Sequence, residues 1–182
     1  MEIVLIHPEI PHNTGCAARL AAAVGLRLHL VAPLGFSLED RYLKRAGLDY
    51  WPMVEMTVHK DWQAADKALS DGHETPLSSR LRLFSARGGT SLFATDFSEH
   101  DLLCFGCESK GLPTELLAAH PGRRVYIPIR KGIRSLNLAN AVCLAAYTAM
   151  SSAGLGLPVN DGAYEPPPAT TLGTQPADIV KA

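Results

Sequence analysis

The chain has 182 residues, of which 47% are hydrophobic and 19% are charged. A chain of this length buries about 68–70% of the surface that its unfolded form exposes, so a single domain can be stable without disulfides or a metal ion. The 17 lysines and arginines balance 18 acidic residues, and the net charge of −1 excludes a globally basic protein of the histone or ribosomal kind. Any contact with nucleic acid must therefore come from a local basic patch.

The cysteines and the N-terminal segment indicate an intracellular protein without disulfides. Four scattered cysteines are too few for a disulfide framework, and residues 1–10 lack the basic flank and long apolar region of a signal peptide. The apolar stretch at residues 17–26 is broken by Arg19 and is shorter than the roughly 20 residues that a membrane span needs. We therefore expect a cytoplasmic protein without a transmembrane segment.

The chain opens with a β-α-β pattern. Residues 2–7 form a short apolar run that is ended by prolines, which predicts a buried strand followed by a stiff turn. An alanine-rich helix follows, for which Asn13 is the expected N-cap and Gly25 the expected end. Residues 28–32 then predict the second strand.

The rest of the chain continues this alternation. Further strands are expected at residues 54–58, 81–86, 102–105 and 125–129, and further helices at residues 38–46, 62–69, 113–119 and 136–153. Ser135 is the expected cap of the last helix, and residues 70–79 are expected to form a loop. The pattern predicts an α/β fold, in which helices cover both faces of a mostly parallel sheet. Ligands bind such sheets beyond the carboxyl ends of the strands.

We expect one domain over residues 1–157. Residues 158–182 contain a run of three prolines and few apolar side chains, which predicts a poorly ordered tail. The chain has no internal repeat.

The segment HNTGCAARLAAAVG carries the first candidate residues. Asn13 and Gly15 are ordinary cap and turn residues, and this is the simplest interpretation of both. Arg19 differs, because it lies in a helix made otherwise of alanine, leucine and valine. A guanidinium there needs a carboxylate or phosphate partner unless it lies at the surface. The alternative interpretation of Arg19 is therefore an exposed arginine, or one paired with an acidic residue, that has no role in a site.

The segment CFGCESKGLPTEL carries the second set. Gly106 follows a short strand, where a missing side chain lets a ligand or another backbone approach closely. Glu108, two residues further on, is also a candidate, and the alternative interpretation is an ordinary loop carboxylate. The Cys104-x-x-Cys107 pair invites a metal or redox interpretation, but no second pair lies at zinc spacing and Cys104 belongs to the buried strand. We predict no metal site.

The segment RRVYIPIRKGIRSLNLANAV is the most basic part of the chain. No acidic residue lies between its five basic residues, which are Arg123, Arg124, Arg130, Lys131 and Arg134. Such a concentration suits a polyanionic backbone, although a solvated loop is the alternative. Ser135 and Asn137 open the final helix, where free backbone N–H groups favour a negative group.

Several familiar active-site patterns are absent from the sequence. There is no G-x-G-x-x-G after the first strand, no Walker P-loop, no G-x-S-x-G elbow and no H-E-x-x-H. The seven histidines form no cluster at ligand spacing, so each is expected to be a surface or packed histidine.

Together, the three segments resemble the three motifs of the SPOUT RNA methyltransferases. The matching patterns are N-x-G-x-x-x-R at residues 13–19, F-G-x-E-x-x-G-L-P at residues 105–113, and I-P-I followed by R-S-L-N-L-x-N-A at residues 127–141. The sequence is most similar to the branch that methylates the ribose 2′-hydroxyl of the tRNA wobble nucleotide, cytidine or uridine. The resemblance implies a trefoil-knotted fold, a homodimer and S-adenosylmethionine as the methyl donor.

The resemblance also implies roles for individual residues. Arg19 matches the arginine that is treated as catalytic in the family. Because an arginine with a pKa above about 12 is almost never neutral, we expect it to hold the nucleotide and stabilise the developing alkoxide. The expected cofactor-binding residues are Phe84, Gly106, Ile127, Ser135 and Leu136, and those expected to shape the site or contact substrate are Asn13, Glu108, Arg134 and Asn137.

The chain departs from the family pattern at two positions. Cys16 stands where close relatives often have asparagine, and Cys107 stands where they often have proline. The expected contacts with a tRNA anticodon arm come from the basic run at residues 123–134 and from the helix that carries Arg41, Lys44 and Arg45. A homodimer would present two copies of this surface.

Three alternatives to this function follow from the same residues. The first is a 2′-O-methyltransferase that acts on ribosomal RNA or on another tRNA position, because the motifs report cofactor and chemistry more than target. The second is a non-catalytic RNA-binding module, which the retained Arg19 disfavours. The third is a nucleotide-dependent oxidoreductase, which the missing glycine fingerprint disfavours.

Overall fold

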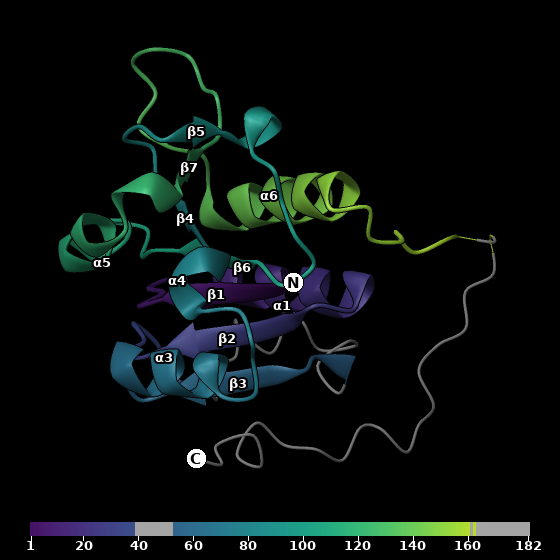
Figure 1. Ribbon diagram of the computed structural model, residues 1–182. Helices are drawn as coiled ribbons and strands as arrows, with labels where there is room; N and C mark the ends of the chain where they lie inside the picture. Colours follow the sequence, from purple (N-terminus) through teal and green to yellow (C-terminus); the bar gives the residue numbers. More distant parts are fainter. Residues whose placement is uncertain (39–52, 161, 163–182) are drawn as a thin grey trace.

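Seven parallel strands form the centre of the molecule (Figure 1). The computed structural model describes residues 1–38, 53–160 and 162. Every pair of neighbouring strands is parallel, which confirms the predicted sheet. In spatial order the strands are β3 (Met56–His59), β2 (Arg27–Val31), β1 (Glu2–Ile6), β6 (Leu102–Phe105), β4 (Leu81–Phe84), β7 (Arg124–Tyr126) and β5 (Thr90–Ser91).

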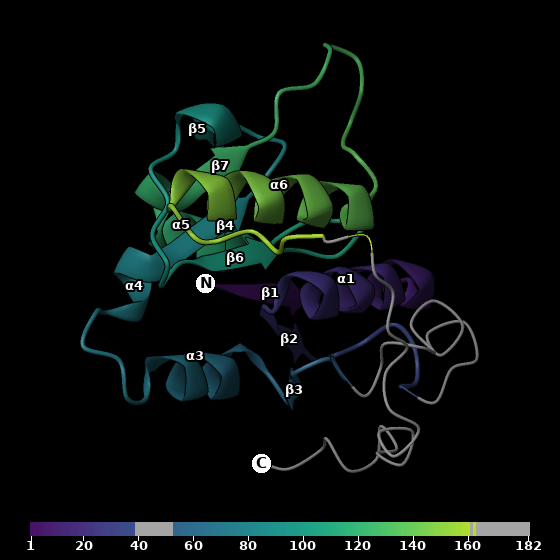
Figure 2. The same ribbon diagram turned by 90° about the vertical axis from the view of Figure 1, so that its right-hand side faces the viewer.

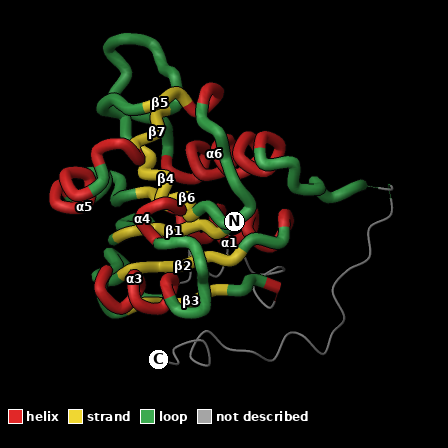
Figure 3. Tube along the Cα trace, viewed as in Figure 1, coloured by secondary structure: helices red, strands yellow, loops and turns green. Residues whose placement is uncertain are grey.

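Helices cover both faces of the sheet, as the alternating pattern predicts (Figure 2 and Figure 3). One face carries α1 (Pro11–Val24) and α6 (Leu138–Ser152). The other face carries α3 (Trp62–Ser70), α4 (Leu77–Arg80) and α5 (Thr114–Ala119). Two 3₁₀ turns, η2 (Leu92–Ala94) and η3 (Pro121–Arg123), complete the described elements. In the described ranges no helix combines the length and the apolar character that crossing a membrane requires.

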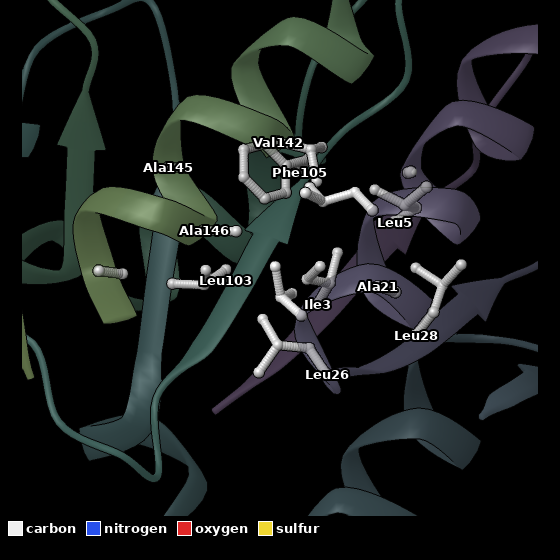
Figure 4. Packing of buried hydrophobic residues seen from close by; sticks show 14 of the residues in the cluster. Ile3, Leu5, Ala21, Leu26, Leu28, Leu103, Phe105, Val142, Ala145 and Ala146 are labelled. Carbon is white, nitrogen blue, oxygen red and sulfur yellow. The ribbon is translucent and has the colours of Figure 1, made fainter. Parts of the chain in front are cut away.

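The alternating side chains of β1 build two separate cores. Ile3 and Leu5 pack with α1 and α6 on one side of the sheet, and Figure 4 shows this cluster around Phe105 and Val142. Val4 and Ile6 pack with α3, α4 and α5 on the other side. Each fully buried side chain of this size contributes about 1.5–3 kcal/mol, so the strand is held from both faces.

Helix α1 begins earlier than predicted. Its N-cap is Ile10, Pro11 occupies the first turn, and no side chain caps the helix from that position. The expectation that Asn13 caps this helix is therefore wrong, because the fixed φ of Pro11 already starts the helix three residues earlier. The predicted end is confirmed, since Gly25 has a φ of 70° and Leu26 donates from its backbone N to Ala21 O over 3.0 Å.

Other local predictions differ from the structure in smaller ways. Asn137, not Ser135, caps α6, because its side-chain oxygen accepts hydrogen bonds from the backbone N of Ala139 and Asn140. The predicted loop at residues 70–79 contains the start of α4, and β5 was not predicted. The predicted helix at residues 38–46 and most of the predicted tail lie outside the described residues.

A buried polar cluster joins the amino-terminal half of the sheet to the segment before β4. His29 Nδ1 lies 3.0 Å from His59 Nε2, and His29 Nε2 lies 2.7 Å from Glu2 Oε2. Arg80, which is almost completely buried, approaches Glu2 Oε1 to 3.5 Å and donates to the backbone oxygens of Leu69 and His100. His29 and His59 are packed histidines, as predicted, and the parallel pairing of β2 and β3 brings them together.

Candidate active site

A cavity of about 530 Å³ lies beyond the carboxyl ends of β4 and β6. This volume falls within the roughly 300–1,000 Å³ that small-molecule sites usually have. The sequence patterns converge here, since the lining includes Asn13, Phe84, Gly106, Glu108, Ile127, Arg134, Ser135, Leu136 and Asn137. Three segments that are far apart in the sequence therefore share one site.

One wall of the cavity is apolar and flat. The rings of Phe84 and Phe105, at the ends of β4 and β6, stack with centroids 4.5 Å apart and an interplanar angle of 13°. Ile127, Leu138 and Ala141 extend this surface from the end of β7 and the start of α6. Such a wall suits a planar heterocycle, which would gain burial there without requiring a charged partner.

Gly106 lets two backbone segments approach closely at the floor of the cavity. A Cβ at this position would lie 1.9 Å from the carbonyl carbon of Gly111 and 2.0 Å from the backbone N of Leu112. The turn between them is closed by Gly111, whose backbone N donates to Cys107 O over 2.8 Å. Glycine is therefore required at position 106 for steric reasons.

Glu108 holds the start of α1. Its Oε2 accepts from the backbone N of Glu9 at 2.8 Å, and its Oε1 accepts from the backbone N of Ile10 at 3.3 Å and from Asn13 Nδ2 at 2.8 Å. A carboxylate at a helix N-terminus also interacts favourably with the helix dipole. Glu108 thus supplies the anionic partner that no residue within α1 provides.

Asn13 and Asn137 continue this network towards α6. Asn13 is buried within the first turn of α1, and its Oδ1 accepts from Asn137 Nδ2 at 3.0 Å. The Oδ1 of Asn137 caps α6 through Ala139 and Asn140, at 3.0 Å and 3.3 Å. The sequence pattern indicated both residues as site-shaping and offered a helix cap as the simpler interpretation of Asn13, whereas the structure uses Asn13 to connect two helices.

Arg19 does not line the cavity. Of the ten candidate residues that were predicted from the sequence, it is the one missing from the lining formed by the described residues. It lies on α1, six positions after Asn13, or about 9 Å further along the helix axis at 1.5 Å per residue. Its side chain is exposed, on the same helix whose first turn forms part of the cavity.

The basic run at residues 123–134 does not form one patch. Arg124 is half-buried and donates from Nη2 to Leu117 O over 3.1 Å, while Arg123 acts electrostatically on Asp101 and Arg82 near the amino ends of β6 and β4. Arg134 instead lines the cavity, on the loop that joins β7 to α6 and projects from the molecule in Figure 1. Strand β7 separates the two groups, so the expectation of a single patch is wrong.

Two cations that line the cavity were not predicted. Arg87 follows β4, and Lys110 follows Glu108 in the turn after β6. Together with Arg134 they give the cavity lining three cations, and Glu108, which also lines the cavity, accepts three hydrogen bonds. Arg87 could have been found from sequence, because it stands one residue beyond the predicted strand at 81–86.

The two cysteines of the C-x-x-C pair lie in different environments. Cys104 is completely buried in β6, and burial raises the pKa of its thiol far above the usual range. Its Sγ donates to Leu102 O over 3.4 Å. In the part of the chain that the structure describes, no three His, Cys, Asp or Glu side chains are placed to hold a metal ion.

The fold and the site together indicate a class of protein. A parallel α/β sheet with a mostly apolar, cation-rimmed cavity at the carboxyl ends of its strands is typical of an enzyme or binding protein for a nucleotide-like ligand.

Comparison with known proteins gives the family. Residues 1–147 match the family described as the SpoU rRNA Methylase family. A Burkholderia ambifaria protein named tRNA (cytidine(34)-2'-O)-methyltransferase is 44% identical over 153 residues, covering 84% of this chain and 95% of that protein. A chain solved under the description "Structural insights into the 2-OH methylation of C/U34 on tRNA" is 49% identical, with a TM-score of 0.76 over 83% of this chain and 94% of its own. The protein belongs to the SpoU methylase family.

A further structural relative is consistent with this assignment. A putative RNA methyltransferase from Bacillus anthracis is 37% identical, with a TM-score of 0.74 over 87% of this chain and 99% of its own. The resemblance drawn from the three motifs is therefore confirmed at the level of the family and the fold.

Proposed function

We propose that this protein transfers a methyl group from S-adenosylmethionine to the ribose 2′-hydroxyl of nucleotide 34, cytidine or uridine, of tRNA. The observation that carries the proposal is the convergence of the three motif segments on one cavity. The reaction and target follow the relatives, which cover most of the chain and are named or described for this reaction.

The cavity has the chemistry that S-adenosylmethionine requires. Phe84, Phe105 and Ile127 offer an apolar wall for the adenine, and the turn after Gly106 and the segment at Ser135 and Leu136 offer backbone groups for the ribose. Recognition by backbone groups would account for the lack of an acidic fingerprint after the first strand. When bound, the cofactor supplies an electrophilic methyl group on a sulfonium.

Arg19 is proposed to act on the acceptor side of the reaction. It lies outside the cavity but on the helix whose first turn lines it. A guanidinium beside the ribose and its 3′ phosphate would orient the nucleotide and stabilise negative charge on the 2′-oxygen as the proton leaves. Because the guanidinium stays protonated at neutral pH, it would contribute electrostatics and alignment rather than accept the proton.

The anticodon arm is the proposed partner of the surface around the cavity. Arg130, Lys131 and Arg134 lie on the loop between β7 and α6, and Arg134 lines the cavity together with Arg87 and Lys110. These residues replace the whole basic run of 123–134 as the candidate RNA contact in the described structure. Arg41, Lys44 and Arg45 remain candidates, although they lie outside the described residues.

A homodimer is proposed to complete this surface. The outward face of α6 exposes Leu144 and Tyr147, and Phe93 on η2 beside it is 67% exposed. A second copy would remove these apolar side chains from water. The trefoil knot and a cytoplasmic location belong to the same proposal and rest on the family resemblance.

One experiment tests the reaction and the target together. Purified protein is incubated with S-adenosylmethionine that carries a labelled methyl group and with unmodified tRNA, and the labelled ribose is mapped by nuclease digestion. Label on nucleotide 34, and none when that nucleotide is 2′-deoxy, is the expected result. Label elsewhere in the tRNA would contradict the proposed position.

Ribosomal RNA is the second candidate substrate. The family description names rRNA, and the three cations around the cavity carry no information that distinguishes one RNA from another. Parallel reactions with ribosomal RNA separate the two candidates, because only the true substrate should be labelled to one methyl group per molecule.

A further inference from the structure

Reciprocal hydrogen bonds join the loop that carries Glu9 to the loop that carries Glu108 and Ser109. The backbone N of Glu9 donates to Glu108 Oε2 at 2.8 Å. In return, the carboxylate of Glu9 accepts from the backbone N of Ser109 at 3.0 Å and from Ser109 Oγ at 2.6 Å. Each loop therefore holds the other through a glutamate, although the two loops are about 100 residues apart in the sequence.

Glu9 is held in this position from its other side as well. The backbone N of Gly35 donates to Pro8 O at 2.9 Å, and a Cβ at Gly35 would lie 2.7 Å from the Cα of Glu9. The loop after β2 thus packs directly against the backbone of Glu9. The hydrogen bonds from Ser109 lower the pKa of Glu9, so the group that accepts them is a carboxylate at neutral pH.

The contact joins the two sides of the proposed reaction. Ser109 and Glu108 line the cavity proposed for the methyl donor, whereas Glu9 directly precedes Ile10, the N-cap of α1, the helix that carries Arg19. The Glu9 side chain does not line the cavity, so it acts from outside the binding volume. We call the Glu9 carboxylate with the Ser109 N–H and hydroxyl the loop clasp.

We propose that the loop clasp sets the alignment of donor and acceptor, with Glu9 and Ser109 as positioning residues for methyl transfer. This inference rests on the proposed function, because it assigns the acceptor side to α1. The turn after β6 and the N-terminus of α1 are held at one spacing by the clasp and by Glu108. A displacement of about 1 Å at such a spacing can lower a transfer rate by about 100-fold.

The proposal predicts different effects on the rate of methyl transfer and on the affinity for the cofactor. The apolar wall that would hold the adenine comes from Phe84, Phe105 and Ile127, none of which contacts Glu9 or Ser109 through the clasp. Loosening the clasp should therefore leave most of the cofactor affinity in place. The rate at saturating cofactor should fall, because the donor and α1 are no longer held at the reactive spacing.

The test uses four variants of the two residues and one control variant, all in the full chain. Glu9→Gln replaces one of the two acceptor oxygens of Glu9 by an amide nitrogen that cannot accept a hydrogen bond. Ser109→Ala removes the hydroxyl donor. The double variant combines the two substitutions. Ser109→Thr retains the hydroxyl and is the rescue variant. Glu74→Gln, an exposed glutamate before α4, is the matched control.

Three quantities are measured for each variant. These are the dissociation constant of S-adenosylmethionine by calorimetry, the single-turnover rate of methyl transfer to tRNA, and hydrogen exchange of the amide of Ser109. We expect each single variant to lose about tenfold in rate and less than threefold in affinity. The double variant should be no slower than the slower single variant, and Ser109→Thr should restore most of the rate.

Other results overturn the inference. Equal losses of rate and affinity would mean that the two residues only build the cofactor pocket, and additive losses would mean that they do not act as a pair. If the wild-type protein transfers no methyl group to tRNA, the proposed function fails. The clasp is then judged by Ser109 amide exchange, which must accelerate in Glu9→Gln and remain unchanged in Glu74→Gln.

Discussion

Asn137 Nδ2 donates a 3.0 Å hydrogen bond to Asn13 Oδ1, across 124 positions of the sequence. The same side chain of Asn137 caps α6 with its oxygen, so one residue both starts a helix and attaches it to α1. The two functions of Asn137 can be separated by substitution, because a shorter side chain can still cap the helix.

We predict that Asn137→Ala lowers the free energy of unfolding by about 1–3 kcal/mol. The loss combines a missing N-cap with the buried Asn13 amide oxygen left without its donor. Asn137→Ser should recover the capping contribution of about 1 kcal/mol but not the link to Asn13. Urea denaturation measures both, and equal stability of the two variants would show that the cap contributes nothing.

We predict that Gly106→Ala abolishes measurable binding of S-adenosylmethionine. The new Cβ would overlap the backbone of Gly111 and Leu112, so the turn that forms the cavity floor must move. Gly122→Ala is the matched control, because a Cβ there would meet nothing within 4 Å. Calorimetric titration gives the affinity, and circular dichroism verifies that both variants fold. Unchanged affinity in Gly106→Ala would place the cofactor elsewhere.

For Arg19→Ala, the expected result is a loss of at least about 100-fold in methyl transfer, with cofactor affinity retained. The residue lies outside the cavity, on the helix that leads from it, so its contribution should fall on the acceptor. Arg27→Ala, which removes an exposed arginine paired with Glu55, serves as the control. A decrease in cofactor affinity that accounts for the whole loss of rate would contradict the acceptor-side role.

Acidification should destabilise the protein through the buried histidine pair. Burial lowers the pKa of His59 below its ordinary 6.5, with His29 contributing in the same direction. The unfolded chain therefore binds more protons than the folded chain below about pH 6.5, and stability decreases as pH falls in that range. Glu2, whose pKa is lowered mainly by the hydrogen bond from His29, adds a second loss at pH values below its ordinary 4.5.

The Tm measured by calorimetry at pH 7, 6 and 5 checks this prediction. His59→Gln should show a smaller decrease between pH 7 and pH 5 than the wild type, because the buried titrating ring is gone. His73→Gln, which changes an exposed histidine, should keep the wild-type dependence. Identical slopes in all three proteins would assign the acid sensitivity to other groups.

Much of the fold could be predicted because strands and helices can be recognised from the local sequence pattern. The run at residues 102–105 is short, apolar and followed by Gly106, and the structure has β6 over those same residues. The candidate site could be found for a related reason, since parallel strands place their carboxyl ends at one edge. Tertiary contacts could not be found in this way.

Two errors and one contact that was not predicted share this cause. Asn13 was predicted as a cap because the sequence cannot indicate that Glu108 and Asn137 reach it from distant segments. The basic run was predicted as one patch because the sequence does not show that Arg124 donates to Leu117 O whereas Arg134 lines the cavity. The contact of His29 with His59 depends on the register of β2 against β3, which no local pattern contains.

The place of β6 in the sheet constrains the order in which the chain can complete its core. β6 lies between β1 and β4, both of which precede it in the sequence. Until residues 102–105 are available, β1 can pair only with β2, and β4 has neither of its two neighbours. A nascent or truncated chain that ends before residue 102 would therefore expose the unpaired edges of two apolar strands, which are sites of aggregation.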